Sequence, residues 1–292
     1  MHNNLVRVLI TGCHSIIGQW LIKRCQGKFY VLGTSKDEST PLKKERFEYI
    51  KLDVTSRKMV KEVFKKFNPR FVVNTAGMNC IERCENEKEQ CWKINVDSVN
   101  NLTYYSKFVN AKFIHISSSF IFDGKKGNYI EEDRPFPTTY YGKSKLASEN
   151  IVKSSGLEWS IIRTSFIYGK DTIKKSKCFV DNLLNQVKQK NKIDIEENII
   201  LNPTYIGNFV DAVWKIIKLE KSGVFHIAGR ETSTLEDFIK KIITINGFDS
   251  NLVQLKDKNN SIKNFGMIVT NAEKELNMKF LNVEEGLRFY FL

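Results

Sequence analysis

The chain has 292 residues, of which 41% are hydrophobic and 12% aromatic, and its formal net charge is +13. This length allows a large core in one α/β domain or in a domain with a smaller lobe, and no apolar run approaches the roughly 20 residues of a membrane span. The lysines and arginines are scattered and form no basic stripe with interleaved aromatics, which argues against a nucleic-acid partner.

The first half of the chain alternates apolar, β-branched runs with segments of helical periodicity. The predicted strands are 5–11, 29–34, 47–52, 70–74, 112–117 and 159–164. The predicted helices between them are 16–25, 57–67, 85–109 and 141–154. This alternation predicts right-handed βαβ units and a doubly wound, parallel Rossmann-type sheet with helices on both faces.

The second half is less regular. Its predicted elements are helices at 179–189, 206–219 and 234–246, a strand at 224–228 and a polar loop at 256–260. We expect 1–165, joined by about 198–222, to form a dinucleotide-binding domain, and 166–292 to form a smaller substrate-binding lobe. Because the sequence contains no linker or internal repeat, the lobe should pack on the main domain.

The turn after the first predicted strand has the pattern of a phosphate-binding loop. It reads Thr-Gly-Cys-His-Ser-Ile-Ile-Gly over 11–18. Gly12 would make the tight turn, and Gly18 would let the helix pack closely on the sheet. The residues whose backbone would hold a pyrophosphate at the helix start are Ser15, Ile16 and Ile17. Ser15 replaces the usual middle glycine, so a turn without a ligand stays open, and His14 is expected to be a surface loop residue.

Residues after the second and third predicted strands would contact the adenosine end of a cofactor. Ser35 and Lys36 offer a hydroxyl and a cation, which suit the 2′-phosphate of NADP, whereas Asp37 would bind the ribose 2′-hydroxyl of NAD. The sequence therefore favours NADP(H) and leaves NAD(H) open. Asp53 and Val54 follow the third strand and are placed to meet the adenine.

A hydroxyl, a phenol and an ammonium are expected together near the fifth strand. Ser118 follows this strand, while Tyr141 and Lys145 are four residues apart on one helix and share a face. Ser118 would hydrogen-bond a carbonyl oxygen, Tyr141 would protonate it, and Lys145 would bind the nicotinamide ribose. The ammonium of Lys145 is expected to lower the tyrosine pKa from its usual value of about 10. The alternative is an exposed lysine and a tyrosine buried against the prolines at 135–137.

Several segments in order resemble one family. They are 11–18, 72–77, 117–124, 129–137, 141–146, 163–169, 203–204 and 225–229. As a set they are similar to the extended short-chain dehydrogenase/reductases, and within them to the dTDP-4-dehydrorhamnose reductase group. The resemblance covers nearly the whole chain. It implies an NADPH-dependent reductase of a 4-keto nucleotide sugar that supplies a deoxysugar for a surface polysaccharide.

The resemblance also assigns residues. It implies that Ala76 and Gly77 contact the cofactor, and that the substrate is contacted by Ser119, Phe120 and Phe166. The chain departs from the family in two places. The family usually has Thr-Asp-Tyr at 118–120, where this chain has Ser-Ser-Phe, and the Arg-Pro element expected near the C-terminus is missing from 263–269. Both departures concern the sugar nucleotide, so they bear on the substrate more than on the chemistry.

Two other functions stay open. A nucleotide-sugar epimerase or dehydratase would use the same scaffold, but a dehydratase needs additional carboxylates, and Ser119 stands where the family often has Asp. A non-catalytic regulatory subunit is the second alternative: the β subunit of methionine adenosyltransferase resembles this family and binds NADP without needing turnover. Homodimers are common in the family and Mg²⁺ takes part in some relatives, and the sequence decides neither point.

The cysteines and the first residues indicate the compartment. The six cysteines form no Cys-x-x-Cys pair, and no cluster of possible ligands commits the chain to a metal. The N-terminus lacks the layout of a signal peptide. We therefore expect a cytoplasmic protein without a metal site and without a membrane partner.

Overall fold

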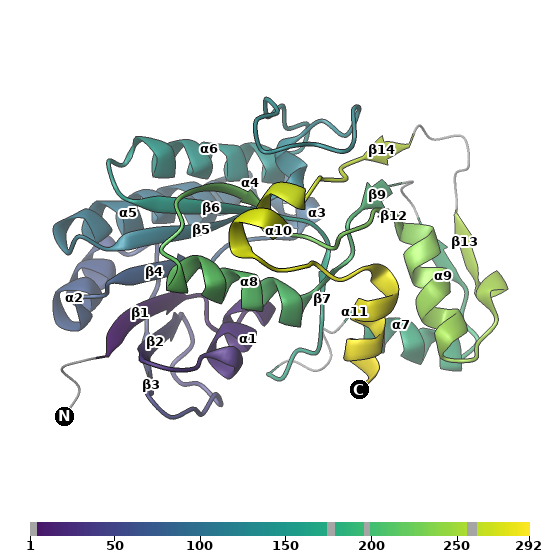
Figure 1. The fold of residues 1–292 in the computed structure, drawn as a ribbon, viewed down its shortest axis with the longest axis horizontal. Helices are drawn as coiled ribbons and strands as arrows, with labels where there is room; N and C mark the ends of the chain where they lie inside the picture. The colour runs from purple at the N-terminus through teal and green to yellow at the C-terminus, as the bar shows by residue number, and fades with distance from the viewer. Residues whose placement is uncertain (1–4, 174–178, 196–198, 256–261) are drawn as a thin grey trace.

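A seven-stranded parallel sheet forms the centre of the molecule (Figure 1). Its strands are β1 (Val6–Thr11), β2 (Phe29–Ser35), β3 (Phe47–Lys51), β4 (Phe71–Asn74), β5 (Lys112–Ser118), β6 (Trp159–Thr164) and β11 (Gly223–His226). Their order across the sheet is β11-β6-β5-β4-β1-β2-β3. The structure is a computed structural model that describes residues 5–173, 179–195, 199–255 and 262–292, so Cys178 and the polar loop predicted at 256–260 lie outside the described residues.

Helices cover both faces of this sheet. One face is covered by α1 (Ile16–Arg24) and α8 (Ile206–Lys218), and the other by α2 (Arg57–Phe67), α5 (Ser98–Phe108) and α6 (Tyr140–Ser154). Successive side chains of a strand point to opposite faces, so Val8 and Ile10 of β1 join one hydrophobic cluster and Leu9 joins the other. The predicted doubly wound Rossmann-type fold is confirmed.

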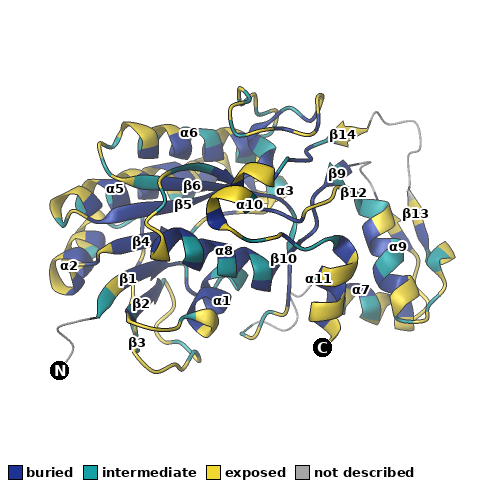
Figure 2. Ribbon diagram, in the orientation of Figure 1, coloured by how far each residue is buried: buried dark blue, intermediate teal, exposed yellow. Residues whose placement is uncertain are grey.

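The burial pattern follows these layers. Figure 2 shows that the central strands are buried, while the outward faces of α2, α5 and α6 are exposed. Strands covered on both faces read as continuous apolar runs, which is why the sequence showed them clearly. Within the described residues, no helix combines the length and apolar character that crossing a membrane requires.

Shorter elements make up the remainder, and several gather at one end of the sheet, to the right in Figure 1. The helices are α7 (Phe179–Lys188), α9 (Leu235–Ile245), α10 (Thr270–Leu276) and α11 (Val283–Phe291). The strands are β7 (Ile167–Tyr168), β8 (Ile193–Ile195), β9 (Ile199–Leu201), β10 (Thr204–Tyr205), β12 (Ser233–Thr234), β13 (Val253–Leu255) and β14 (Lys263–Asn264). Two or three residues are too few for a recognisable alternation, so the sequence did not predict these strands.

The segment 206–226 belongs with the large sheet, although it comes late in the chain. Helix α8 packs beside α1, and β11 pairs with β6, with Val224 opposite Ile161. The large sheet therefore takes its last strand from beyond residue 222, which was the expected end of the contributing segment. The division into two domains stays a prediction.

The helix predicted at 85–109 is interrupted. The chain forms α3 (Ile81–Asn86), α4 (Lys88–Trp92), a π-helical turn at Lys93–Asp97, and then α5. A π-turn widens the helix by one residue and often occurs at functional sites. It changes which side chains face α6.

Candidate active site

The predicted site residues lie where the strands of the large sheet end. Because its strands are all parallel, their carboxyl ends meet at one edge, and ligands of such sheets bind there. The turns at this edge carry Gly12 after β1, Ser35 at the end of β2, Asp53 after β3, Ala76 after β4 and Ser118 at the end of β5. The fold therefore brings together segments that are far apart in the sequence.

Ser118, Tyr141 and Lys145 form one cluster at this edge. The hydroxyls of Ser118 and Tyr141 are hydrogen-bonded to each other, and Ser118 Oγ also accepts the Phe120 N–H at 3.2 Å. Lys145 is 8% exposed, and its Nζ donates to the Ile116 carbonyl oxygen at 2.5 Å. The structure thus brings the three side chains to one edge of the sheet, and their catalytic roles stay a prediction.

The phenol of Tyr141 holds its proton firmly. Burial raises the pKa of Tyr141 to about 12, the hydrogen bond with Ser118 lowers it, and the nearby thiols of Cys84 and Cys91 raise it further. The expectation that Lys145 lowers this pKa below its usual value is wrong for this structure, because desolvation dominates and the ammonium is directed at a backbone carbonyl. Tyr141 is therefore a protonated acid at neutral pH.

Lys145 is the other perturbed group of the cluster. Burial lowers its pKa to about 8, and the carboxylate of Glu149 one turn later acts in the opposite direction. An ammonium has three donors. Among the described residues, one of these donors has an acceptor, the Ile116 oxygen. Two donors of a buried cation therefore remain for a ligand that brings hydroxyl acceptors.

Gly142 lets the first turn of α6 approach β5. A Cβ at this position would be 2.1 Å from the Phe120 carbonyl oxygen and 2.9 Å from Pro137 Cβ. Real Cβ atoms do not approach a backbone oxygen this closely, so no larger residue fits without displacing the helix. The sequence analysis did not single out Gly142, although it stands next to Tyr141.

Asn95, in the π-turn, connects the β4 loop to α6. Its Oδ1 accepts the Met78 N–H at 2.7 Å, and its Nδ2 donates to the Met78 oxygen and to Ser144 Oγ, both at 2.9 Å. Ser144 Oγ in turn donates to the Tyr141 carbonyl oxygen at 2.7 Å. Asn95 thus fixes the loop after Gly77 relative to the first turn of α6. No sequence signal identified it.

A chain of buried hydrogen bonds joins β1 to α6. Thr11 Oγ1 donates to Asn74 Oδ1 at 2.6 Å, and Asn74 Nδ2 is 3.3 Å from His115 Nδ1. His115 Nε2 is 2.9 Å from Ser148 Oγ, which donates to the Lys145 oxygen at 2.7 Å. Every donor has an acceptor if His115 is neutral with its proton on Nε2. Burial and the charge of Lys145 hold the pKa of His115 well below its usual value, which keeps it neutral.

The turn from β1 to α1 has the close contacts of a phosphate-binding loop. Gly12 has a φ of 65°, and a Cβ there would lie 2.7 Å from Ala76 Cα. A Cβ at Gly18 would lie 2.6 Å from Cys13 Cα. Ser15, at the position of the usual middle glycine, caps α1 by accepting the Gly18 N–H at 3.1 Å. Ser15 therefore stabilises the helix start.

The same turn offers donors to an anion. The first N–H groups of an α-helix have no partner within it, and in α1 these belong to Ile16 and Ile17, because Gly18 and Gln19 donate to Ser15. The positive end of the helix dipole lies there too. Together with the tight turn at Gly12, these groups fit the pyrophosphate of a dinucleotide cofactor.

The residues expected to contact the adenosine end of the cofactor differ in exposure, and Asp53 is hydrogen-bonded within the protein. Ser35 is half-buried, Lys36 is exposed and Val54 is buried. Asp53 is exposed, and its Oδ1 accepts both the N–H and the hydroxyl of Thr55, at 2.9 and 2.7 Å. His14, expected to be a surface loop residue, has a side chain only 10% exposed, so that expectation is wrong.

The residues expected to contact the substrate lie on the other side of Ser118. Ser119 is fully buried, and its Oγ has no hydrogen-bond partner among the described residues. Phe120 packs against Phe265 with the ring centroids 4.6 Å apart. Phe166 contacts Phe179 and Phe238 edge to face. Phe120 also contacts the ring of Tyr141 edge to face, so aromatic side chains lie beside the cluster, and the substrate contacts stay a prediction.

A buried ion pair lies next to the cluster: Glu149, one turn after Lys145 on α6, pairs with Arg163 of β6. Arg163 donates from Nε and Nη2 to the two carboxylate oxygens of Glu149, at 3.1 and 3.0 Å, and both side chains are buried. Burial opposes ionisation of Glu149, but the hydrogen bonds and charge of Arg163 outweigh it and lower the carboxyl pKa. This geometry gives Arg163 and Glu149 a structural role.

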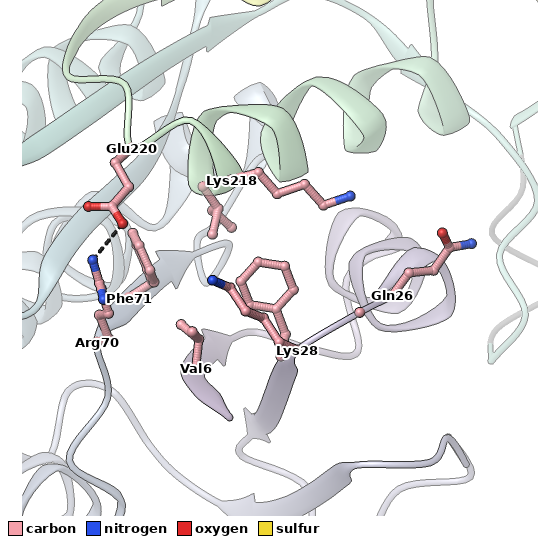
Figure 3. Close-up of a pocket in the computed structure, with 10 residues that line it drawn as sticks. Val6, Gln26, Lys28, Arg70, Phe71, Lys218 and Glu220 are labelled. Carbon is pink, nitrogen blue, oxygen red and sulfur yellow. Dashed lines mark hydrogen bonds and ion pairs between the residues drawn. The ribbon is translucent and has the colours of Figure 1, made fainter. Parts of the chain in front are cut away.

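A hollow of about 450 Å³ opens at the opposite edge of the sheet (Figure 3). It lies where β1, β2 and β4 begin, and its rim includes Lys28, Lys218 and the ion pair of Arg70 with Glu220. Because the cluster of Ser118, Tyr141 and Lys145 is at the carboxyl ends of the strands, this hollow is separate from it.

Comparisons with known proteins agree with this geometry. The family model described as "RmlD substrate binding domain" matches residues 6–263. The spore coat polysaccharide biosynthesis protein SpsK of Bacillus subtilis is 24% identical, over 98% of this chain and 97% of its own length. Methionine adenosyltransferase 2 subunit beta of Xenopus tropicalis is 28% identical, over 78% of this chain and 68% of its own. The crystal structure of dTDP-4-dehydrorhamnose reductase from Bacillus anthracis in complex with NADP superposes with a TM-score of 0.85 at 24% identity, covering 98% of this chain and 99% of that one.

Proposed function

The chain belongs to the RmlD substrate-binding family of extended short-chain dehydrogenase/reductases, and on that premise we propose that it is an NADPH-dependent reductase of a 4-keto nucleotide sugar. The observation that carries the proposal is the cluster of Ser118, Tyr141 and Lys145. It presents a protonated phenol, hydrogen-bonded to a hydroxyl, beside a buried ammonium. Reduction of a ketone needs a proton donor of this kind.

Each side chain has one task in the reaction. When bound, NADPH supplies a hydride to the carbonyl carbon. Ser118 donates a hydrogen bond to the carbonyl oxygen and orients it toward Tyr141. Tyr141 then gives its proton to that oxygen, and the hydrogen bond from Ser118 favours the phenolate left behind. A positioned acid contributes about 10²–10⁴ in rate, and orientation of the reactants adds to it.

The cofactor is held by the chain's own groups at both ends. The N–H groups of Ile16 and Ile17 bind the pyrophosphate, and the two remaining donors of Lys145 bind the nicotinamide ribose. Ala76 lies against Gly12, so Ala76 and Gly77 line the cofactor site between the pyrophosphate and the nicotinamide ribose. Ser35 and Lys36 favour the 2′-phosphate of NADP, with NAD as the second choice.

The substrate side supports a nucleotide sugar. Phe120 and Phe166 offer apolar surface beside Ser118, and Ser119 replaces a carboxylate that a dehydratase would use. SpsK is named for the biosynthesis of a spore coat polysaccharide, which agrees with a deoxysugar precursor as the product. The likeness to methionine adenosyltransferase 2 subunit beta supports a regulatory subunit as a second candidate.

Turnover of the keto sugar tests the proposal. Oxidation of NADPH is followed with dTDP-4-keto-6-deoxy-L-mannose for the native protein and for Tyr141→Phe, with Tyr140→Phe as the matched control. We expect turnover by the native protein and the control, and a loss of at least about 10² in kcat for Tyr141→Phe. Tight NADPH binding without turnover of this sugar or its GDP and UDP analogues would overturn the reductase and favour the regulatory subunit.

A further inference from the structure

Two adjacent residues after β2 send opposite signals about the cofactor. Lys36 suits the 2′-phosphate of NADP, whereas the carboxylate of Asp37 would repel that phosphate and bind the 2′-hydroxyl of NAD. Both side chains belong to exposed residues at the carboxyl edge of the sheet. Sequence alone does not say which of them controls the site.

His14 comes from a different turn and reaches Asp37. Its Nδ1 is 2.6 Å from Asp37 Oδ2 and 3.0 Å from Ser35 Oγ. A carboxylate only accepts hydrogen bonds, so His14 Nδ1 carries the proton and donates to Asp37. The side chain of His14 is 10% exposed and that of Asp37 is 52% exposed, so the bond lies at the inner side of the carboxylate.

Further contacts hold this arrangement. The ring of His14 stacks on Tyr49 of β3, with centroids 5.5 Å apart and an angle of 3° between the planes. The Tyr49 hydroxyl is 2.9 Å from Ser35 Oγ and is also hydrogen-bonded to the Asp37 carbonyl oxygen. The Asp37 N–H donates to Ser35 Oγ at 3.2 Å. The turn after β1, the end of β2 and strand β3 thus keep the carboxylate against His14.

We propose that His14 sets the cofactor preference by sequestering Asp37. The bond from His14 engages Oδ2 and holds the carboxylate toward the turn after β1, so fewer of its acceptor sites are directed at the 2′-hydroxyl of NAD. It also disperses the negative charge that would otherwise oppose a 2′-phosphate next to Lys36. His14 is therefore a specificity-determining residue that acts through Asp37. This inference rests on the proposed function only in that the chain must bind a nicotinamide dinucleotide.

Dissociation constants test the inference without any catalytic readout. NADPH and NADH are titrated against the native protein, His14→Ala, Asp37→Asn and the double variant, with protein fluorescence as the signal. Hydrogen bonds to charged groups contribute about 1.5–3 kcal/mol, so His14→Ala should lower the preference for NADPH over NADH by roughly tenfold or more. Removing the carboxylate in the double variant should restore that preference.

The control is Glu38→Gln, because Glu38 is a neighbouring exposed carboxylate that pairs with Lys51 instead of His14. It should leave the ratio of the two dissociation constants unchanged. The proposed role of His14 is overturned if His14→Ala has the melting temperature of the native protein and an unchanged ratio of the two dissociation constants. So would a double variant that fails to restore the preference. If the native protein bound neither dinucleotide, the proposed function would fail together with this inference.

Discussion

Two residues of α6, one turn apart, carry buried charges with different partners. Near the start of the helix, Lys145 donates to one backbone carbonyl and has a pKa lowered to about 8. One turn later, both oxygens of Glu149 receive hydrogen bonds from Arg163. A buried charge paired inside the protein is costly to lose singly because its partner is left unpaired, whereas a buried charge with donors left over can bind a ligand. The helix joins the two in one rigid element.

Replacing Glu149 should distinguish most clearly between the roles of Glu149 and Lys145. Glu149→Ala leaves the guanidinium of Arg163 buried without its partner, and breaking such a pair costs about 3–5 kcal/mol of unfolding free energy. Urea denaturation measures the loss. Lys153→Gln is the control, since Lys153 lies 3.4 Å from the same carboxylate but is partly exposed. A loss below about 1 kcal/mol in Glu149→Ala would contradict the structural role.

Replacing Lys145 should lower the rate of turnover without lowering the free energy of unfolding. Lys145→Met keeps the length of the side chain and relieves a desolvated charge, so the free energy of unfolding should not fall. The rate should fall by at least about 10², because the nicotinamide ribose loses the donors that position it. Steady-state kinetics and urea denaturation on the same preparation check both parts. Equal losses in rate and in stability would place Lys145 with Glu149 among the structural charges.

The pH dependence of stability sharpens the contrast. Between about pH 8 and 9.5 the unfolded chain still holds the Lys145 proton, since lysine ordinarily has a pKa of about 10.4, while the folded chain has released it. Stability from this group therefore rises with pH across that window, by about 1 kcal/mol per unit. The difference in unfolding free energy between native protein and Lys145→Met should show this rise. A flat or falling difference would mean that Lys145 is not desolvated.

The smallest effect is expected at the helix cap. Thr139 Oγ1 accepts the Gly142 N–H at 3.0 Å and begins α6. Thr139→Ala should cost about 1 kcal/mol of unfolding free energy, and Thr139→Ser, which keeps the acceptor, should cost little. Because the cap orients the turn that carries Tyr141, Thr139→Ala should also lower kcat modestly. An unchanged unfolding midpoint in Thr139→Ala would show that the approach of Gly142 to Phe120 alone fixes this turn.

The sequence predicted the long elements and the placement of Ser118, Tyr141 and Lys145 at one edge of the sheet because each has a local signature. Apolar runs marked the buried strands, and the spacing of Tyr141 and Lys145 placed them on one helix face. The resemblance to the family added the order of the motifs. The assignment of Ser118 followed from its position at the end of a strand, which holds in the structure.

What the sequence did not predict depends on contacts between distant turns. Asn95 sits in a π-turn that no periodicity marks, and it acts through Met78 and Ser144. The burial of the His14 side chain was not predicted, because it depends on a contact with Asp37, which is 23 positions away in the sequence. The raised pKa of Tyr141 comes from burial and from two thiols on other helices, so the spacing to Lys145 gave the wrong direction.

The position of β11 has a consequence for synthesis of the chain. Until residues 223–226 leave the ribosome, β6 is an unpaired edge strand with buried-type side chains, and α8 has not yet covered the face beside α1. Exposed edges of this kind promote association between chains. A nascent or truncated chain that ends near residue 165 should therefore aggregate rather than fold alone, because residues 206–226 supply both α8 and the last strand of the sheet.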